Sequence, residues 1–356
     1  MDLPKQRLAQ QRLLGPACAR PEDVVQSLLA VQSQDYLGAK WAVAQRTQGG
    51  DDAAVQEAFQ GGRILRTHVM RPTWHFVAPA DIRWLLELTG PRVHALNAHY
   101  YGLHGLDAPA AKRSNARIVK ALSRGEHLTR DELGRALAEG GHAPSGNRLA
   151  YFIMRAELDA LICSGAMRGK QHTYALIEER APRLQALGRD EAVARIARRY
   201  VSGHGPAQAQ DLAWWSGLSV ADAKRGLEAN RNELERAVVE GKTYWLAPTP
   251  PVTRQRGPIV HLLPNYDELL IAFKDRSALL DPRVTPRTGV LSSHFVLIGG
   301  RIVGGFRRTL TKRDVVIKAE LLRPLTAVER KGLDKAAARY AESLGLALRL
   351  ETTVVA

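Results

Sequence analysis

The chain has 356 residues, is 45% hydrophobic and carries a formal net charge of +15 at pH 7. This length and apolar content exclude a disordered chain and are typical of two or three domains, or of one compact array of small ones. The positive excess favours a polyanionic partner, most simply nucleic acid. The alternative is a basic protein without such a partner, because an Arg-rich, Lys-poor composition also fits a GC-rich genome.

The first predicted unit, residues 1–105, has helices followed by two strands. Val24, Leu28 and Val31 are spaced four and three apart, which predicts a helix that runs on to residue 34. Pro21 suits the first turn of this helix. The predicted elements are helices over 21–34, 38–48 and 51–60, then strands over 64–70 and 73–78 with a tight connection at 71–72.

The same order recurs in residues 106–180 and in residues 181–250. Thr129 followed by Glu132 is the pattern of a capping box at a helix start. The predicted elements are helices over 114–123, 129–139 and 147–163 with a hairpin over 167–177, then helices over 191–201, 206–216 and 219–228 with strands over 234–239 and 243–246. Helices followed by a hairpin are typical of winged-helix units, and we predict three of them in tandem.

Residues 251–356 are the predicted fourth domain and follow a proline-rich linker over 249–258. The predicted elements are strands over 259–263, 289–298, 301–307, 315–322 and 347–355, with a helix over 326–344. This composition predicts a β-rich, barrel-like domain. The fold class is therefore α+β, with three tandem winged-helix units followed by a β-rich C-terminal domain.

Gln32 and Gln34 are the candidate catalytic residues. In a regular helix, residues two apart point roughly 200° apart, so these two converge on one ligand only if the helix ends or distorts there. A glutamine amide is neither acid nor base, but it donates and accepts hydrogen bonds. It suits a reaction with an activated leaving group, which needs an oriented water and a polar wall beside a developing cation. The alternative is that both are solvated or capping residues.

The first wing supplies further candidates for binding DNA. Strand alternation puts Trp74 and His75 on opposite faces, so His75 faces a groove, and contacts DNA or a water there, if the Trp74 side is core. The alternative for His75 is a hydrogen-bonded structural histidine. Arg71, expected at the turn, is placed to bind a phosphate or is a solvated turn residue.

Candidate DNA contacts are also expected in the later units. Lys170 lies at the predicted tip of the second hairpin, and Arg307 and Arg308 lie in a C-terminal strand where they are able to grip the DNA backbone. Asp35, next to the glutamines, either steadies a cationic sugar or ends a helix. The paired carboxylates of 266–268, near 274–276, lack a third metal ligand at a familiar spacing, so a structural ion-pair network is the expectation there.

Three blocks of this sequence resemble the AlkZ-like DNA glycosylases. The blocks, in the order in which the family has them, are 31–36 continued by 41–46, then 68–77, then 263–269 continued by 274–276. Gln32 and Gln34 match the two glutamines of the family's Gln-x-Gln motif, with Ser33 at the middle position, which is often apolar in the family. The resemblance implies three winged helices in a C-shaped scaffold around DNA, completed by a β-barrel, with Gln32 and Gln34 catalytic.

The resulting prediction is a monofunctional DNA glycosylase that hydrolyses the N-glycosidic bond of bulky or cross-linking alkylated purines of the N7-alkylguanine type. Some members of the family protect bacteria from their own DNA-alkylating products, so self-resistance is the expected biological role. The expected partner is double-stranded DNA with alkylated bases, bound by a monomer. The alternative is a non-enzymatic winged-helix DNA-binding protein or transcriptional regulator.

No cofactor or metal is expected. The two cysteines, Cys18 and Cys163, form no CxxC pair, which argues against a cysteine-based zinc site and a disulfide framework. The polar N-terminal residues and the lack of an apolar run of about 18 residues predict a cytoplasmic protein without a membrane segment.

Overall fold

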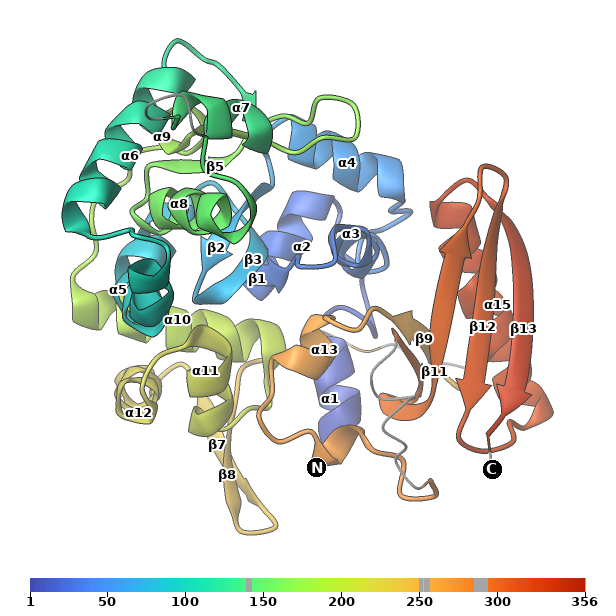
Figure 1. Ribbon diagram of the computed structural model, residues 1–356. Helices are drawn as coiled ribbons and strands as arrows, with labels where there is room; N and C mark the ends of the chain where they lie inside the picture. The colour runs from blue at the N-terminus through green and yellow to red at the C-terminus, as the bar shows by residue number, and fades with distance from the viewer. Residues whose placement is uncertain (139–142, 250–251, 253–256, 285–293, 356) are drawn as a thin grey trace.

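The computed structural model describes the whole chain except residues 139–142, 250–251, 253–256, 285–293 and 356 (Figure 1). In the described part, helices and small sheets fill one side of the molecule, and a larger sheet forms the other side.

The first group ends in a three-stranded sheet of order β1-β3-β2. Its elements are α1 (Leu3–Gln10), α2 (Pro21–Leu28), β1 (Ala30–Gln32), α3 (Tyr36–Ala44), α4 (Asp52–Gln60), β2 (Leu65–Val69) and β3 (Arg71–Val77). The predicted helix over 21–34 is wrong beyond Leu28, because Leu29 adopts a φ of 67° and the chain turns into β1. Residues 30–32 then pair with β3, a partner that local spacing does not reveal.

The second group has the elements α5 (Ile82–Leu103), α6 (Ala108–Leu122), β4 (Leu128–Thr129), α7 (Arg130–Ala136), α8 (Gly146–Leu158), β5 (Ile162–Ser164), β6 (Thr173–Leu176) and α9 (Ile177–Arg180). The capping box of Thr129 and Glu132 is confirmed. Two predictions are wrong here. The helix over 147–163 ends at Leu158, so that Cys163 lies in β5, and the hairpin is formed by β5 and β6 around a longer loop.

Helix α5 is absent from the predicted elements, because Gly90 and Pro91 interrupt its sequence and both residues disfavour a helix interior. Close packing accounts for the glycine. A Cβ on Gly90 would lie 3.0 Å from the carbonyl oxygen of Leu158, so the residue lets α5 approach the end of α8.

The third group follows the predicted order and is coloured yellow-green to yellow in Figure 1. Its elements are α10 (Arg189–His204), α11 (Ala209–Ser216), α12 (Val220–Ala229), β7 (Glu235–Val239) and β8 (Lys242–Leu246). Gly241 has a φ of 74° at the turn between the two strands, a backbone conformation that favours glycine.

The fourth group contains a five-stranded sheet of order β13-β12-β11-β10-β9. Its elements are β9 (Val260–Leu263), α13 (Glu268–Ile271), η1 (Ser277–Leu279), β10 (His294–Ile298), β11 (Arg301–Leu310), β12 (Asp314–Leu321), α15 (Ala327–Ser343) and β13 (Ala347–Val354). The described strands leave the sheet open at β9 and β13, so the predicted barrel is not formed by them. The reason is that α15 carries the chain across to pair β13 in parallel with β12, away from β9. The predicted strand residues 289–293, and most of the predicted linker, lie outside the described residues.

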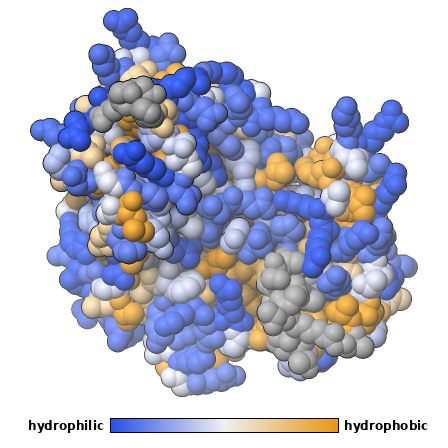
Figure 2. Space-filling view, in the orientation of Figure 1, coloured by the Kyte–Doolittle hydropathy of each residue, from blue (hydrophilic) through white to orange (hydrophobic). Residues whose placement is uncertain are grey.

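The first group and the C-terminal sheet share one apolar core, which buries residues of α2, α3 and α4 together with residues of β10, β11, β12 and α15. The indole of Trp41 joins the two parts: its Nε1 donates to the carbonyl of Leu262 at 2.7 Å, and its ring lies 4.9 Å from that of Tyr340. Hydrophilic residues dominate the surface in Figure 2, and apolar patches gather over the C-terminal sheet. No helix among the described residues is both long and apolar enough to cross a bilayer.

Candidate catalytic and DNA-binding site

Gln32 and Gln34 are both held against strand β3. Gln32 is the last residue of β1, is only 7% exposed, and its Oε1 accepts a hydrogen bond from Nη2 of Arg71 at 3.4 Å. Gln34 is exposed, and its Oε1 accepts from the backbone amide of Trp74 at 3.4 Å. Gln32 ends β1 and Gln34 lies in the bend that follows, so the helical geometry that would separate them by about 200° does not apply. The chain leaves the sheet after Gln32. The side chain of Gln32 is therefore enclosed, whereas that of Gln34 is exposed to solvent.

Ser33, the middle residue of the motif, is fully buried and bound on both sides. Its amide donates to the carbonyl of Trp74 at 2.7 Å. Nε of Arg66 donates to the Ser33 hydroxyl at 3.3 Å, and Nη2 of Arg66 donates to the Ser33 carbonyl at 3.0 Å. The Arg66 guanidinium also lies 4.3 Å from the Trp74 ring. A serine therefore fits this position because Arg66 satisfies its hydroxyl.

Glu268, at the start of α13, fixes the backbone of the motif. Its carboxylate is 1% exposed and accepts from the amide of Gln32 at 2.8 Å. The same carboxylate accepts from Nε1 of Trp215 at 2.8 Å, and His204 lies 3.3 Å from it. A glutamate 236 residues away in the sequence therefore fixes the backbone position of Gln32.

The neighbouring Asp267 is also fully buried and forms a bidentate ion pair. Its two oxygens accept from Nη1 and Nη2 of Arg46 at 2.8 and 2.7 Å. The acidic residues of this block do form structural ion pairs, but with residues outside it, Asp267 with Arg46 and Asp275 with Lys242. Among the described residues, no group of three or more His, Cys, Asp or Glu side chains is placed to hold a metal ion.

His75 does not face a groove that is open to DNA, so that prediction is wrong. Its side chain is fully buried, and Nδ1 lies 3.0 Å from the carbonyl of Thr73. Burial and the nearby charge of Arg71 hold the pKa of His75 well below its usual value, so the ring is neutral. Alternation along β3 is as predicted, but Trp74 takes the open side and His75 the interior.

Arg71 lies in β3 after a turn at Met70, whose φ is 64°, and not at the turn itself. The Arg71 side chain is partly buried beside Gln32, and this burial lowers its pKa. Arg71 is therefore a neighbour of the motif instead of a freely solvated turn residue.

The C-terminal sheet reaches the motif through Arg308. Its Nη2 donates to Oδ2 of Asp35 at 2.9 Å, and its Nη1 donates to the hydroxyl of Tyr340 at 2.8 Å. The other oxygen of Asp35 accepts from the amide of Gly38 at 3.0 Å and caps α3. Asp35 therefore caps the start of α3, the helix-end role expected as one alternative, and pairs with one arginine. The structure brings Arg308 to the motif, whereas Arg307 is exposed on the other face of β11.

Lys170 is exposed in the loop between β5 and β6. The structure shows no contact between its side chain and the glutamines, but the same loop touches the first group elsewhere. The ring of His172 lies 4.6 Å from that of Tyr36, edge to face, and the amide of Met167 donates to Gln60 Oε1 at 2.5 Å.

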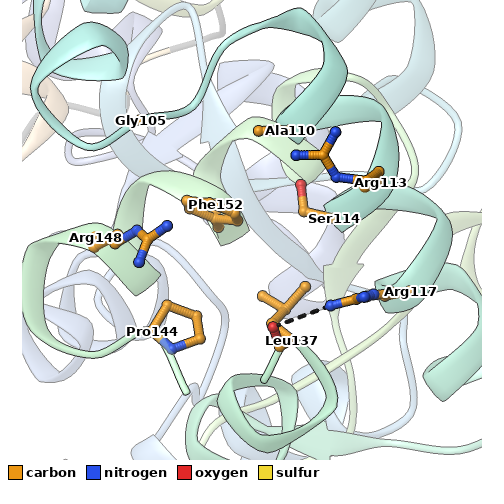
Figure 3. A pocket seen from close by; sticks show the side chains of 9 residues that line it. All are labelled: Gly105, Ala110, Arg113, Ser114, Arg117, Leu137, Pro144, Arg148 and Phe152. Atoms are coloured by element: carbon orange, nitrogen blue, oxygen red, sulfur yellow. Dashed lines mark hydrogen bonds between the residues drawn. The ribbon is translucent and has the colours of Figure 1, made fainter. Parts of the chain in front are cut away.

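Two of the cavities among the described residues are formed largely by the second group. One, of about 260 Å³, is surrounded by Arg113, Arg117 and Arg148, and none of the predicted site residues lines it (Figure 3). Two of these arginines bind backbone carbonyls, Arg117 that of Leu137 at 3.5 Å and Arg148 that of His104 at 3.2 Å.

The other cavity, of about 460 Å³, has Gln34 and Trp74 in its wall, together with aromatic residues of α5 and α8. Sequence reasoning missed this second cavity because it did not predict α5. The signal that was present is the cluster of aromatic residues and histidines over 99–104.

Comparisons with known proteins give one family and one fold. A family model described as DNA glycosylase AlkZ-like matches residues 25–343. The chain is 25% identical over 358 aligned positions to the interstrand DNA cross-link repair glycosylase of Streptomyces sahachiroi, an alignment that covers 94% of this chain and 93% of that protein. The solved structure of the Streptomyces sahachiroi DNA glycosylase AlkZ superposes with a TM-score of 0.77 at 22% identity, covering 99% of this chain and 98% of that one.

Proposed function

This chain belongs to the AlkZ-like DNA glycosylase family, and we propose that it hydrolyses the N-glycosidic bond of N7-alkylated guanine in double-stranded DNA. The observation that carries the proposal is the pair of glutamines, Gln32 and Gln34, held against one strand, with one enclosed and one open to solvent. The S. sahachiroi relative bears the name of a cross-link repair enzyme. On that basis we propose that the substrates of this chain include bulky and cross-linking adducts.

The proposed reaction needs no strong acid or base. Guanine alkylated at N7 carries a positive charge, so the bond between C1′ and N9 breaks with its electron pair going to N9, which leaves a neutral base. A water oxygen bonds to C1′ and releases its proton to solvent, and an abasic site remains. The amides of Gln32 and Gln34 orient this water and face the cationic sugar, the type of fixed polar environment that stabilises developing charge.

The surrounding residues support a hydrolytic role without a lyase step. Residues 31–36 contain no lysine. Lys40, the next lysine along the chain, is 4% exposed and donates to Asp52 at 2.6 Å, so it is not free to form a Schiff base. Asp35 pairs with Arg308 and caps α3, so its charge is already neutralised and we give it a structural role. We therefore propose a monofunctional enzyme.

We propose that the three helix-and-hairpin groups, within 1–105, 106–180 and 181–250, act as winged-helix units that hold the duplex together with the domain over 251–356. Arg307 and Lys170 are the exposed cations proposed to contact phosphates. Arg71 and Trp74 act beside the glutamines. The protein acts as a monomer, and its proposed biological role is self-resistance to a DNA-alkylating product. The rival, a non-enzymatic regulator, is disfavoured by membership of a glycosylase family.

The test is single-turnover excision from a duplex that carries one N7-alkylguanine, with abasic sites revealed by heating in alkali. Such adducts also leave spontaneously, so a reaction without protein sets the baseline, and the Gln32→Ala/Gln34→Ala double variant controls for contaminating activity. Wild-type protein is expected to exceed both clearly. If release by the wild type equals the baseline for small and bulky adducts alike, the proposed function is wrong.

A further inference from the structure

The cavity of about 460 Å³ beside Gln34 is continuous with the candidate catalytic site. Gln34 and Trp74 belong to its wall, and the remaining wall comes from α5, α7 and α8 and from the strands β2, β3 and β6. Small-molecule sites in proteins usually measure about 300–1,000 Å³. The cavity is therefore large enough for a ring system, and far larger than a methyl group on N7 would require.

Flat side chains line this cavity, stack on one another and are in part exposed. The rings of Tyr100 and Tyr151 lie 5.4 Å apart and are inclined by only 12°, and His104 stacks 5.0 Å from Tyr151. Tyr100 is 46% exposed and Leu103 is 66% exposed, although both are large and apolar. Grouped apolar side chains at a surface mark binding sites, and open aromatic faces favour stacking on another flat ring.

Trp74 is held in place without any ligand. Its ring lies 4.3 Å from the Arg66 guanidinium and 4.3 Å from the ring of His68. His68 in turn is paired with the buried carboxylate of Glu157. An aromatic side chain that is fixed before binding loses little conformational entropy when a ligand stacks against it.

The charges around the cavity favour a neutral or electron-poor ring. None of the described residues that line the cavity is an aspartate or a glutamate, so a free cation would find no counter-ion there. The cation in the wall, Arg130, donates to the carbonyl of Gly146 at 2.6 Å. This positive group also suits a position close to a DNA backbone.

We propose that this cavity, the adduct subsite, binds the flat aromatic substituent of a bulky N7-alkylated guanine while the glycosidic bond lies at Gln32 and Gln34. The proposal rests on the proposed function and deepens it, because it assigns the bulky part of the substrate to named residues. It makes Tyr100 and Tyr151 specificity-determining residues that do not take part in bond cleavage.

The test compares two duplexes that differ only in the N7 substituent of one guanine, which is methyl in one and naphthylmethyl in the other. Tyr151→Ala is expected to lower kcat/KM for the naphthylmethyl substrate by on the order of tenfold or more, because one stacking partner is lost. It should change the rate for the methyl substrate less than about twofold. Tyr151→Phe keeps the ring and should keep both rates.

A second variant tests the volume of the subsite independently. Ala150 also lines the cavity, so Ala150→Trp should fill it and impair the naphthylmethyl substrate selectively. Leu96→Ala is the matched control, because Leu96 is 57% exposed on α5 one turn before Tyr100 and does not line the cavity. The rates for the methyl substrate show in each case that the variant protein is folded and active.

The outcomes separate the two proposals. Selective loss for the naphthylmethyl substrate supports the adduct subsite. Equal loss for both substrates, no loss for either, or a wild-type protein that removes only the methyl adduct overturns the subsite and leaves the glycosylase function standing. A wild-type protein that removes neither adduct overturns the proposed function, and the subsite with it.

Discussion

The segment that carries Gln32 and Gln34 differs in construction from the adduct subsite next to it. The backbone of the segment is fixed by short polar contacts to remote parts of the chain, among them Glu268 and Arg66. The adduct subsite is lined by aromatic rings that touch one another and remain partly open. The difference fits two tasks, because cleavage needs groups held in one geometry whereas varied adducts need a surface that accepts different shapes.

The largest expected effect concerns the glutamines themselves. Gln32→Ala and Gln34→Ala should each slow single-turnover excision by on the order of 10²–10³, since each removes one positioned hydrogen-bonding group. The double variant should lose less than the product of the two, because both amides act on the same water. Binding to undamaged DNA should stay close to wild type, since neither side chain is charged.

Gln48→Ala is the matched control for these variants, because Gln48 is an exposed glutamine outside the motif. Its excision rate should equal that of wild type. Full activity in the Gln32/Gln34 double variant would refute the assignment of the catalytic residues, and with it the contrast between a fixed segment and an open subsite.

The second prediction concerns the support of the fixed segment. Glu268→Ala leaves the Gln32 amide, Trp215 Nε1 and His204 without their shared acceptor. We expect the free energy of unfolding to fall by roughly 3 kcal/mol or more, because each buried donor without a partner costs about 1–3 kcal/mol. Denaturant unfolding measures the change.

Glu233→Ala provides the comparison for this experiment, since Glu233 forms only an exposed pair with Arg198. A surface pair of this kind contributes about 0–1 kcal/mol. Equal stability losses in the two variants would show that the buried contacts of Glu268 contribute no more to stability than an exposed ion pair.

A smaller effect is expected for the exposed cations that are proposed to touch DNA. Arg307→Ala should weaken binding to undamaged duplex several-fold and reduce the slope of log K against log salt concentration by about one. Lys335→Ala, an exposed cation on α15, should change neither. Fluorescence anisotropy at several salt concentrations measures both quantities. A wild-type affinity that does not depend on salt would contradict phosphate binding altogether.

The smallest predicted effect links the second hairpin to the first group. Burial is the main cause that lowers the pKa of His172 to about 4, and the charges of Arg66 and Lys40 act in the same direction. The folded state therefore binds fewer protons than the unfolded state between pH 6.5 and about 4, so stability is complete above pH 6.5 and declines as the pH falls through that window.

His172→Phe keeps an aromatic ring beside Tyr36 and removes the titration. Between pH 6.5 and 4 the wild type should lose about 1 kcal/mol more stability than this variant, a figure reduced for the partial exposure of His172. If the free energies of unfolding of the two proteins change in parallel with pH from 6.5 to 4, the contact does not depend on the protonation of His172.

The sequence predicts the parts of this fold that are encoded locally. Much of the order of helices and hairpins, and the capping box at Thr129, follow from neighbouring residues or from short motifs. Strand β1 does not, because it depends on pairing with β3 about 40 residues later. The open sheet does not either, because it results from the path of α15 and β13.

The candidate site shows the same division. Short motifs make Gln32, Gln34 and the acidic block candidates, but they do not show which face of β3 is open, since that depends on what packs against each side. The expected DNA contact of His75 is wrong for this reason, and its alternative, a hydrogen-bonded structural histidine, matches the structure. The sequence does not predict the adduct subsite, because Gly90 and Pro91 disfavour a helix and α5 is therefore not expected. The packing of α5 against α8 becomes visible only in the structure.

The bond between Glu268 and Gln32 also has a consequence for biosynthesis. The glutamine motif leaves the ribosome early, whereas its partner Glu268 follows 236 residues later and Arg308, the partner of Asp35, follows 273 residues after Asp35. A nascent or prematurely terminated chain therefore contains the motif but not the residues that fix it. We therefore expect base excision only after the last third of the chain, which supplies Glu268 and Arg308, has been synthesised.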